Sequence, residues 1–178
     1  MPITANVSII GFMATGKTTT GKILARTLGW SFCDCDVEIQ RVSRLTIDEI
    51  FGYFGENYFR QLETAVLKKV VQGKKQVIAT GGGAVLATEN IGLLKQAGPV
   101  VLLTAPVDVI IARASCSDER PLLKTAALGK RVRELLAKRQ GLYQATANFT
   151  VDTADLNPEQ VAHVISTWLK ANFQLAAE

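Results

Sequence analysis

Gly11-Phe12-Met13-Ala14-Thr15-Gly16-Lys17-Thr18 has the spacing Gly-x-x-x-x-Gly-Lys-[Ser/Thr] of a phosphate-binding P-loop. The apolar run at residues 5–10 predicts a strand directly before it, and the pattern after it predicts a helix that ends at Gly29. In that setting successive backbone N–H groups can face a phosphate, and the helix N-terminus adds positive charge. The chain is therefore expected to bind the phosphates of a nucleotide through this loop.

The side chains at the end of the loop have separate expected roles. Lys17 should reach the β and γ oxygens of the nucleotide, and the Thr18 hydroxyl should be a ligand of Mg²⁺. The residues expected to contact ATP in this part of the chain are Gly11, Ala14, Thr15, Gly16, Lys17, Thr18 and Thr19.

The rest of the chain alternates apolar runs with helical patterns. Further strands are expected at residues 30–33, 76–80, 99–103 and 148–151. A capping box at Thr46–Glu49 opens a helical segment that runs up to Gly73, and Pro158 opens the last helix. Apolar strands separated by helices indicate a parallel sheet covered on both faces. The sequence thus predicts an α/β fold, the three-layer α/β/α P-loop NTPase fold with a mainly five-stranded parallel sheet.

Composition indicates one domain over residues 1–178. Hydrophobic residues make up 48% and charged residues 20% of the chain, which is a globular mix, and no Pro/Gly/Ser-rich linker divides it. The first basic residue is Lys17, so a secretory leader is not expected, and the longest apolar stretch, 100–112, is interrupted by Pro106 and Asp108. A cytoplasmic protein without a membrane partner is therefore predicted.

Charge and cysteine content exclude several kinds of partner. The net charge is +4, and residues 113–139 hold eight lysines and arginines against three acids. Aromatic residues on which bases could stack are nearly absent from that segment, so nucleic acid is not an expected partner. The spacing Cys33-x-Cys35 lacks the second ligand pair of a zinc site, and the three cysteines are expected to be reduced thiols.

Two other classes of enzyme are also excluded. The chain has neither Asn-Lys-x-Asp nor Asp-x-x-Gly, so a signalling GTPase is not expected. Its sole histidine, His163, lies in the last predicted helix, which rules out Ser-His-Asp catalysis and multi-histidine metal sites.

Two carboxylates follow the strand at residues 30–33. Asp34 and Asp36 are two residues apart, and in an extended chain both side chains would face the same way. The pair is either part of a site at the end of this strand or a simple strand-end turn.

Six blocks of sequence together resemble the shikimate kinase family. They are the P-loop, Asp34-Cys35-Asp36, Phe54-Gly55-Glu56-x-x-Phe59-Arg60-x-x-Glu63, Gly81-Gly82-Gly83, Arg120-Pro121-Leu122-Leu123 and Arg139-x-x-x-Tyr143. The resemblance covers nearly the whole chain. It implies phosphorylation of shikimate by ATP to shikimate 3-phosphate, in aromatic amino-acid (chorismate) biosynthesis, with ATP and Mg²⁺ as cofactors.

The resemblance also implies how the acceptor is held. Arg60 and Arg139 would bind the shikimate carboxylate, for which a guanidinium fork is well suited. Asp36 would bind substrate hydroxyls and take the proton of the attacking one. If these arginines do not bind substrate, Arg60 would form a surface ion pair with Glu63, and Arg139 would lie at a solvated helix end.

Backbone and metal contacts complete the implied site. Gly81, Gly82 and Gly83 would bring N–H groups against the substrate and the γ-phosphate, where a side chain would collide; the alternative is a flexible loop. Asp34 would hold Mg²⁺ together with Thr18, since no other predicted strand ends in an acidic residue.

The remaining implied residues serve the nucleotide. Arg113 would cover one face of adenine, and Pro158 would lie near the other. Residues 114–128 would form a mobile lid whose Arg120 closes on the transferring phosphate and shields it from water. The implied catalytic residues are thus Lys17, Asp36 and Arg120.

Two other functions remain open at this stage. One is a related small-metabolite kinase such as a gluconate kinase, and the other is a nucleotide-binding module without catalysis. Ala14 stands where many family members have glycine, and Gln144 stands where glutamate is common. A monomer is expected.

Overall fold

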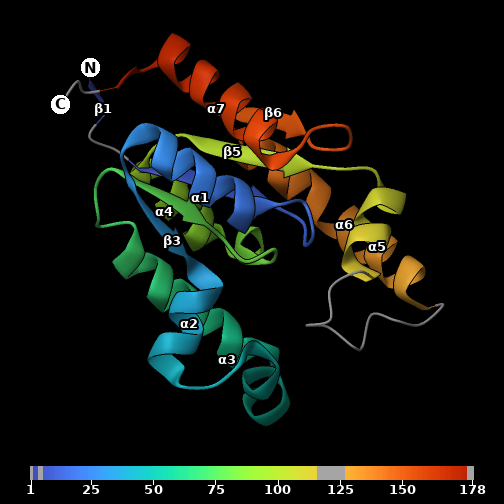
Figure 1. Cartoon of the computed structure of the whole chain (residues 1–178). Coiled ribbons are helices and arrows are strands. Elements are labelled where there is room, and N and C mark those ends of the chain that lie inside the picture. Colours follow the sequence, from blue (N-terminus) through green and yellow to red (C-terminus); the bar gives the residue numbers. More distant parts are fainter. Residues whose placement is uncertain (1, 4–5, 116–126, 176–178) are drawn as a thin grey trace.

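The computed structural model describes residues 2–3, 6–115 and 127–175 (Figure 1). Its strands are β1 (Pro2–Ile3), β2 (Val7–Gly11), β3 (Ser31–Asp34), β4 (Gln76–Ala79), β5 (Val100–Thr104), β6 (Phe149–Asp152) and β7 (Gln174–Leu175). Its helices are α1 (Lys17–Leu28), α2 (Cys35–Ser43), α3 (Ile47–Val70), the 3₁₀ turn η1 (Ala84–Leu86), α4 (Thr88–Ala97), α5 (Val107–Ser115), α6 (Ala127–Thr146) and α7 (Pro158–Asn172).

Five of the strands form a parallel sheet in the order β3-β4-β2-β5-β6. All five lie within two residues of the predicted positions, so the predicted fold class is confirmed. The P-loop strand β2 is central: Ser8 pairs with Ile78 of β4 and with Val100 of β5. The carboxyl ends of parallel strands meet at one edge of a sheet, and this edge is where ligands of such folds bind.

The three layers follow from the alternation of side chains along the strands. In β5, Val101 and Leu103 pack into a cluster with residues of α1 and α7, whereas Val100 and Leu102 pack into another with residues of α3, α4, α5 and α6. Successive residues of a strand point to opposite faces, so a wholly apolar strand requires helices on both. The sheet therefore has α1 and α7 on one side and α4 and α6 on the other (Figure 1).

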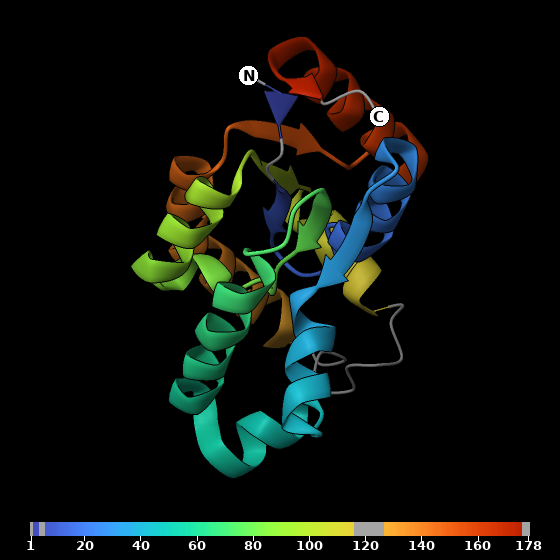
Figure 2. The same cartoon turned by 90° about the vertical axis from the view of Figure 1, so that its left-hand side faces the viewer.

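Helices α2 and α3 extend away from the sheet as a hairpin with its own small core (Figure 2). The core consists of Ile39, Ile50, Phe59 and Val66, all nearly inaccessible to solvent. The predicted capping box at Thr46 opens α3, and Gly55 kinks the helix with a φ of 78° and a ψ of 175°, which a residue with a Cβ adopts only under strain.

The predicted extended geometry of Asp34 and Asp36 is wrong. Strand β3 ends at Asp34, and Asp36 lies in the first turn of α2. The reason is capping: the Asp34 carboxylate accepts the backbone N–H groups of Asp36 and Val37, at 3.0 and 3.4 Å, which would otherwise lack partners at the helix N-terminus. The two carboxylates therefore have different local environments.

Among the helices described, none has the length and apolarity needed to cross a membrane.

Candidate active site

The P-loop joins the central strand β2 to α1. Gly11 has a φ of 143°, and a Cβ there would meet the carbonyl oxygen of Leu103, so this position requires glycine. Gly16 has a φ of 88° and forms the N-terminal cap of α1. The Thr15 hydroxyl and the Lys17 ammonium both donate to the carbonyl oxygen of Phe12, each at 2.8 Å. These bonds hold the loop closed on itself at the helix N-terminus.

Ala14 has a left-handed backbone, with a φ of 59°. That conformation costs an alanine about 1–2 kcal/mol, which a glycine would not lose. The loop thus keeps, with an alanine at position 14, a backbone conformation that suits glycine. This lowers the stability of the folded loop.

The predicted metal ligands lie together. The Thr18 hydroxyl donates to Asp34 Oδ2 at 2.6 Å, and both residues line the same cavity. A hydroxyl and a carboxylate are hard oxygen ligands, and Mg²⁺ in nucleotide enzymes usually takes one or two such groups plus phosphate oxygens and water. Thr18 and Asp34 lie side by side and supply one hydroxyl and one carboxylate, so they fit a Mg²⁺ that also binds phosphate oxygens.

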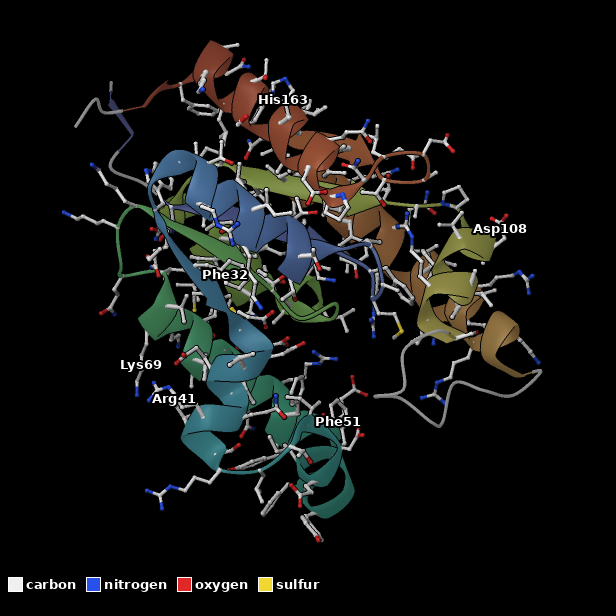
Figure 3. The ribbon with its side chains drawn as sticks, viewed as in Figure 1. Phe32, Arg41, Phe51, Lys69, Asp108 and His163 are labelled. Carbon is white, nitrogen blue, oxygen red and sulfur yellow. The ribbon has the colours of Figure 1, made fainter. Side chains whose placement is uncertain are left out.

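A cavity of about 570 Å³ opens at the carboxyl edge of the sheet. It is lined by residues from the P-loop, from α2 and α3, from the glycine block after β4, and from α5 and α6, among them Phe51 (Figure 3). The sequence-predicted residues that it brings together are Ala14, Gly16, Lys17, Thr18, Thr19, Asp34, Asp36, Arg60, Gly81, Gly82, Gly83, Arg113 and Arg139.

Arg60 is held by two carboxylates of its own helix. Its Nη1 donates to Glu63 Oε2 at 2.7 Å, and its Nε and Nη2 donate to Glu56 Oε1 at 3.3 and 3.1 Å. Burial alone would lower the pKa of the guanidinium, but the charges and hydrogen bonds of Glu63 and Glu56 outweigh it and raise that pKa. The ion pair with Glu63 predicted as the alternative does exist, but Glu63 is 1% exposed, so the pair lines the cavity rather than the surface.

Glu63 lines the same cavity, although from the sequence it was expected only as a possible surface partner of Arg60. Its Oε1 is buried and makes no hydrogen bond within the described part of the chain. Burial raises the pKa of this carboxyl, and the charge and hydrogen bond of Arg60 oppose that rise. Its spacing of three residues from Arg60 indicates an ion pair on one helix face. Its burial could not be predicted in this way, because it depends on the packing of Gly81 against it.

The glycine block fits tightly against these charged groups. A Cβ on Gly81 would lie 2.8 Å from Asp36 Oδ1 and 2.8 Å from Glu63 Oε1. A Cβ on Gly83 would overlap the guanidinium of Arg60, at 2.5 Å from its Cζ. Glycine at these two positions therefore makes room for the side chains predicted to bind the acceptor.

Replacing Gly83 with alanine is expected to displace the Arg60 guanidinium and to raise the KM for the acceptor roughly 10-fold or more, since a charge-assisted contact contributes about 1.5–3 kcal/mol. Gly92→Ala in α4 is the matched control, because a Cβ there meets no atom within 4 Å. Steady-state kinetics of both variants would check this. An acceptor KM for Gly83→Ala equal to that of the control would show that Arg60 does not bind the acceptor.

Arg139 reaches the cavity from within α6, and a tyrosine lies beside it. Arg139 Nη1 donates to the carbonyl oxygen of Gly82 at 3.3 Å, and the Tyr143 hydroxyl donates to the same oxygen. Tyr143 is 3% exposed, and burial raises the pKa of its phenol to about 12, so it stays a donor. The motif Arg139-x-x-x-Tyr143 contained this residue, but its contact with Gly82 depends on the fold.

A second cavity of about 190 Å³ lies behind the P-loop. Arg113 of α5 and Pro158 of α7, the two residues predicted to lie against a nucleobase, both line it. Ala14, Thr15, Gly16 and Thr19 line it as well, which joins this cavity to the phosphate loop.

Several predicted features have no part in the described site. Arg120 and most of the predicted lid, residues 116–126, lie outside the described residues. Cys33 and Cys35 are free thiols; burial raises the pKa of Cys33 to about 11 and that of Cys35 well above its usual value. His163 lies on α7, far from Phe51 at the cavity (Figure 3).

Comparisons with known proteins agree on one family. The sequence model of the shikimate kinase family matches residues 13–170. A shikimate kinase of Thermodesulfovibrio yellowstonii is 45% identical over 160 residues, which are 90% of this chain and 92% of that protein. The structure of shikimate kinase from Acinetobacter baumannii in complex with shikimate has a TM-score of 0.89 at 39% identity and covers 94% of both chains. That from Aquifex aeolicus has a TM-score of 0.82 at 36% identity, covering 94% of this chain and 97% of that one.

Proposed function

This chain belongs to the shikimate kinase family, and on that premise we propose that it transfers the γ-phosphoryl group of ATP to a hydroxyl of shikimate. The products are shikimate 3-phosphate and ADP, and the reaction serves aromatic amino-acid biosynthesis. The observation that carries the proposal is a single cavity in which Lys17 of the P-loop faces the same space as Asp36, Arg60 and Arg139. A phosphate donor and an acidic, hydroxyl-bearing acceptor can meet there.

Two guanidinium groups bind the carboxylate of shikimate, and an aspartate binds its hydroxyls. Within the described residues, the bonds of Arg60 to Glu56 and Glu63 leave two of its five N–H donors for the shikimate carboxylate. Arg139 supplies a second guanidinium, fixed through Gly82. Asp36, in the first turn of α2, accepts hydrogen bonds from substrate hydroxyls.

In the transfer, the acceptor oxygen forms a bond to the γ-phosphorus as the bond from that phosphorus to the ADP oxygen breaks. Asp36 takes the proton that the hydroxyl loses. Lys17 and the backbone N–H groups of the P-loop stabilise the charge on the phosphate oxygens. Thr18 and Asp34 are the proposed ligands of Mg²⁺, which when bound would neutralise phosphate charge.

Nucleotide binding is proposed for the P-loop and the cavity behind it. ATP use follows from family membership. Position around the loop and the second cavity supports the individual ATP contacts proposed for Gly11, Ala14, Thr15, Gly16, Thr19, Arg113 and Pro158. The lid, with Arg120 as its catalytic arginine, stays a prediction, as do a single domain over residues 1–178, a monomer and a cytoplasmic location.

An assay of ADP release with shikimate, with gluconate and without an acceptor tests the proposal. Release should require both Mg²⁺ and shikimate. The gluconate kinase alternative is not favoured by the family match, and a preference for gluconate would overturn the proposal. Equal ADP release without any acceptor would overturn it as well, because the enzyme would then be a nucleotide hydrolase.

A further inference from the structure

Thr153 holds Arg113 at one side of the second cavity. Arg113 Nη1 donates to Thr153 Oγ1 at 2.9 Å, and its Nη2 donates to the carbonyl oxygen of Thr153 at 2.7 Å. Both acceptors belong to one residue, so the two bonds fix the plane of the guanidinium as well as its position. Thr153 itself lines the same cavity, together with Pro158.

Thr153 is in turn fixed to the central sheet. It follows β6 directly and is 3% exposed. Its hydroxyl donates to the carbonyl oxygen of Thr104 at 3.0 Å, and its backbone N–H donates to the same oxygen at 2.8 Å. Thr104 is the last residue of β5.

The hydroxyl of Thr153 therefore has a defined orientation. A threonine hydroxyl carries one proton and two lone pairs. Because the proton is directed at Thr104, a lone pair is left to accept from Arg113. The chain of bonds from Thr104 through Thr153 to Arg113 thus connects the sheet to the wall of the cavity.

We propose that Thr153 is a positioning residue for ATP, which holds the Arg113 guanidinium flat against one face of the nucleobase, opposite Pro158. The inference rests on the proposed function, because that function makes the nucleotide the ligand of this cavity. A guanidinium ordered before binding loses less rotamer freedom when the base stacks on it. Thr153 should therefore affect nucleotide affinity and leave the chemistry at the acceptor unchanged.

The test compares Thr153→Val, which keeps the shape and removes the hydroxyl, with Thr153→Ser, which keeps the hydroxyl. Thr153→Val should raise the KM for ATP and the Kd for ADP by roughly 10-fold, with kcat and the shikimate KM changed less than about 2-fold. Thr153→Ser should be close to the unchanged protein. Thr150→Val, at an exposed threonine of the preceding strand β6, is the control and should have no effect.

A double-variant cycle separates positioning from general structural damage. In an Arg113→Ala background, Thr153→Val should add almost no further loss of ADP affinity, because the group that it positions is already gone. Fully additive losses would overturn the proposal, as would an unchanged ADP Kd in Thr153→Val or an equal loss in Thr153→Ser. Should the valine variant not fold, Thr153→Ala retains the backbone bond to Thr104 and takes its place in both tests.

Calorimetric titration with ADP needs no acceptor, so it tests Thr153 independently of the reaction. If the unchanged protein does not phosphorylate shikimate but binds ADP, the proposed function fails. The comparison of ADP Kd values would then still support or overturn the role of Thr153.

Discussion

Replacing Asp36 with asparagine is expected to lower kcat by about 10²–10⁴-fold while ATP affinity stays close to that of the unchanged protein. Asparagine keeps the size of the side chain and one hydrogen-bond acceptor but cannot take a proton at neutral pH. Asp36 lines the cavity together with Arg60 and Arg139, and its Oδ1 would lie 2.8 Å from a Cβ on Gly81. The loss should therefore appear in the chemical step, in single-turnover as well as steady-state rates.

Two other aspartates serve as controls for this variant. Asp48→Asn makes the same charge change at an exposed residue in the first turn of α3 and should leave kcat unchanged. Asp34→Asn removes a proposed Mg²⁺ ligand, so added Mg²⁺ should restore part of its activity but none of that lost in Asp36→Asn. A near-normal kcat for Asp36→Asn would refute its role as the base, and identical recovery by Mg²⁺ would refute the separate roles.

Replacing Lys17 with methionine is expected to lower kcat by about 10²–10³-fold, the usual cost of removing one group that stabilises transition-state charge. Methionine has a similar length and no charge. In the structure the ammonium donates to the carbonyl oxygen of Phe12 at 2.8 Å, so it is already held at the loop where the phosphates are expected to bind. ATP affinity should fall too, because the same charge attracts the phosphates before the reaction.

The matched control for Lys17 lies on the same helix. Lys22 is exposed on α1, and Lys22→Met removes one positive charge without touching the cavity. Its kcat and KM for ATP should equal those of the unchanged protein. A kcat for Lys17→Met within about threefold of the control would show that the P-loop lysine has no catalytic role here.

Local sequence rules predicted the positions of the strands and the phosphate loop well, because both are recognised from residues that are neighbours in the sequence. The apolar strands and the spacing from Gly11 to Thr18 contain their own periodicity and glycine positions. The prediction that Asp34 and Asp36 share an extended geometry failed because Asp34 caps the N-terminus of α2. Asp36 therefore lies in the first turn of a helix.

The contacts that shape the site depend on tertiary structure, which explains why they were not predicted. Tyr143 bonds to Gly82, 61 residues away, and Arg113 bonds to Thr153, 40 residues away. Glu63 is spaced like a partner in a surface ion pair, and only the packing of Gly81 against it reveals that it is buried. The family resemblance supplied the residues of the site, but the partners that hold them came from the fold.

The separate small core of the α2–α3 hairpin has a consequence for local unfolding. The four residues Ile39, Ile50, Phe59 and Val66 form their own cluster, whereas Leu67 of α3 and Cys35 of α2 pack with Ile10 against the sheet. The part of the hairpin around these four residues can therefore open without exposing the cluster of Val101, which contains no residue of α2 or α3. Backbone amides in α2 and α3 should then exchange with deuterium faster than those of β2 and β5. Because Arg60 of this hairpin is a proposed ligand of shikimate, we expect mild denaturation to weaken shikimate binding before it weakens ADP binding at the P-loop.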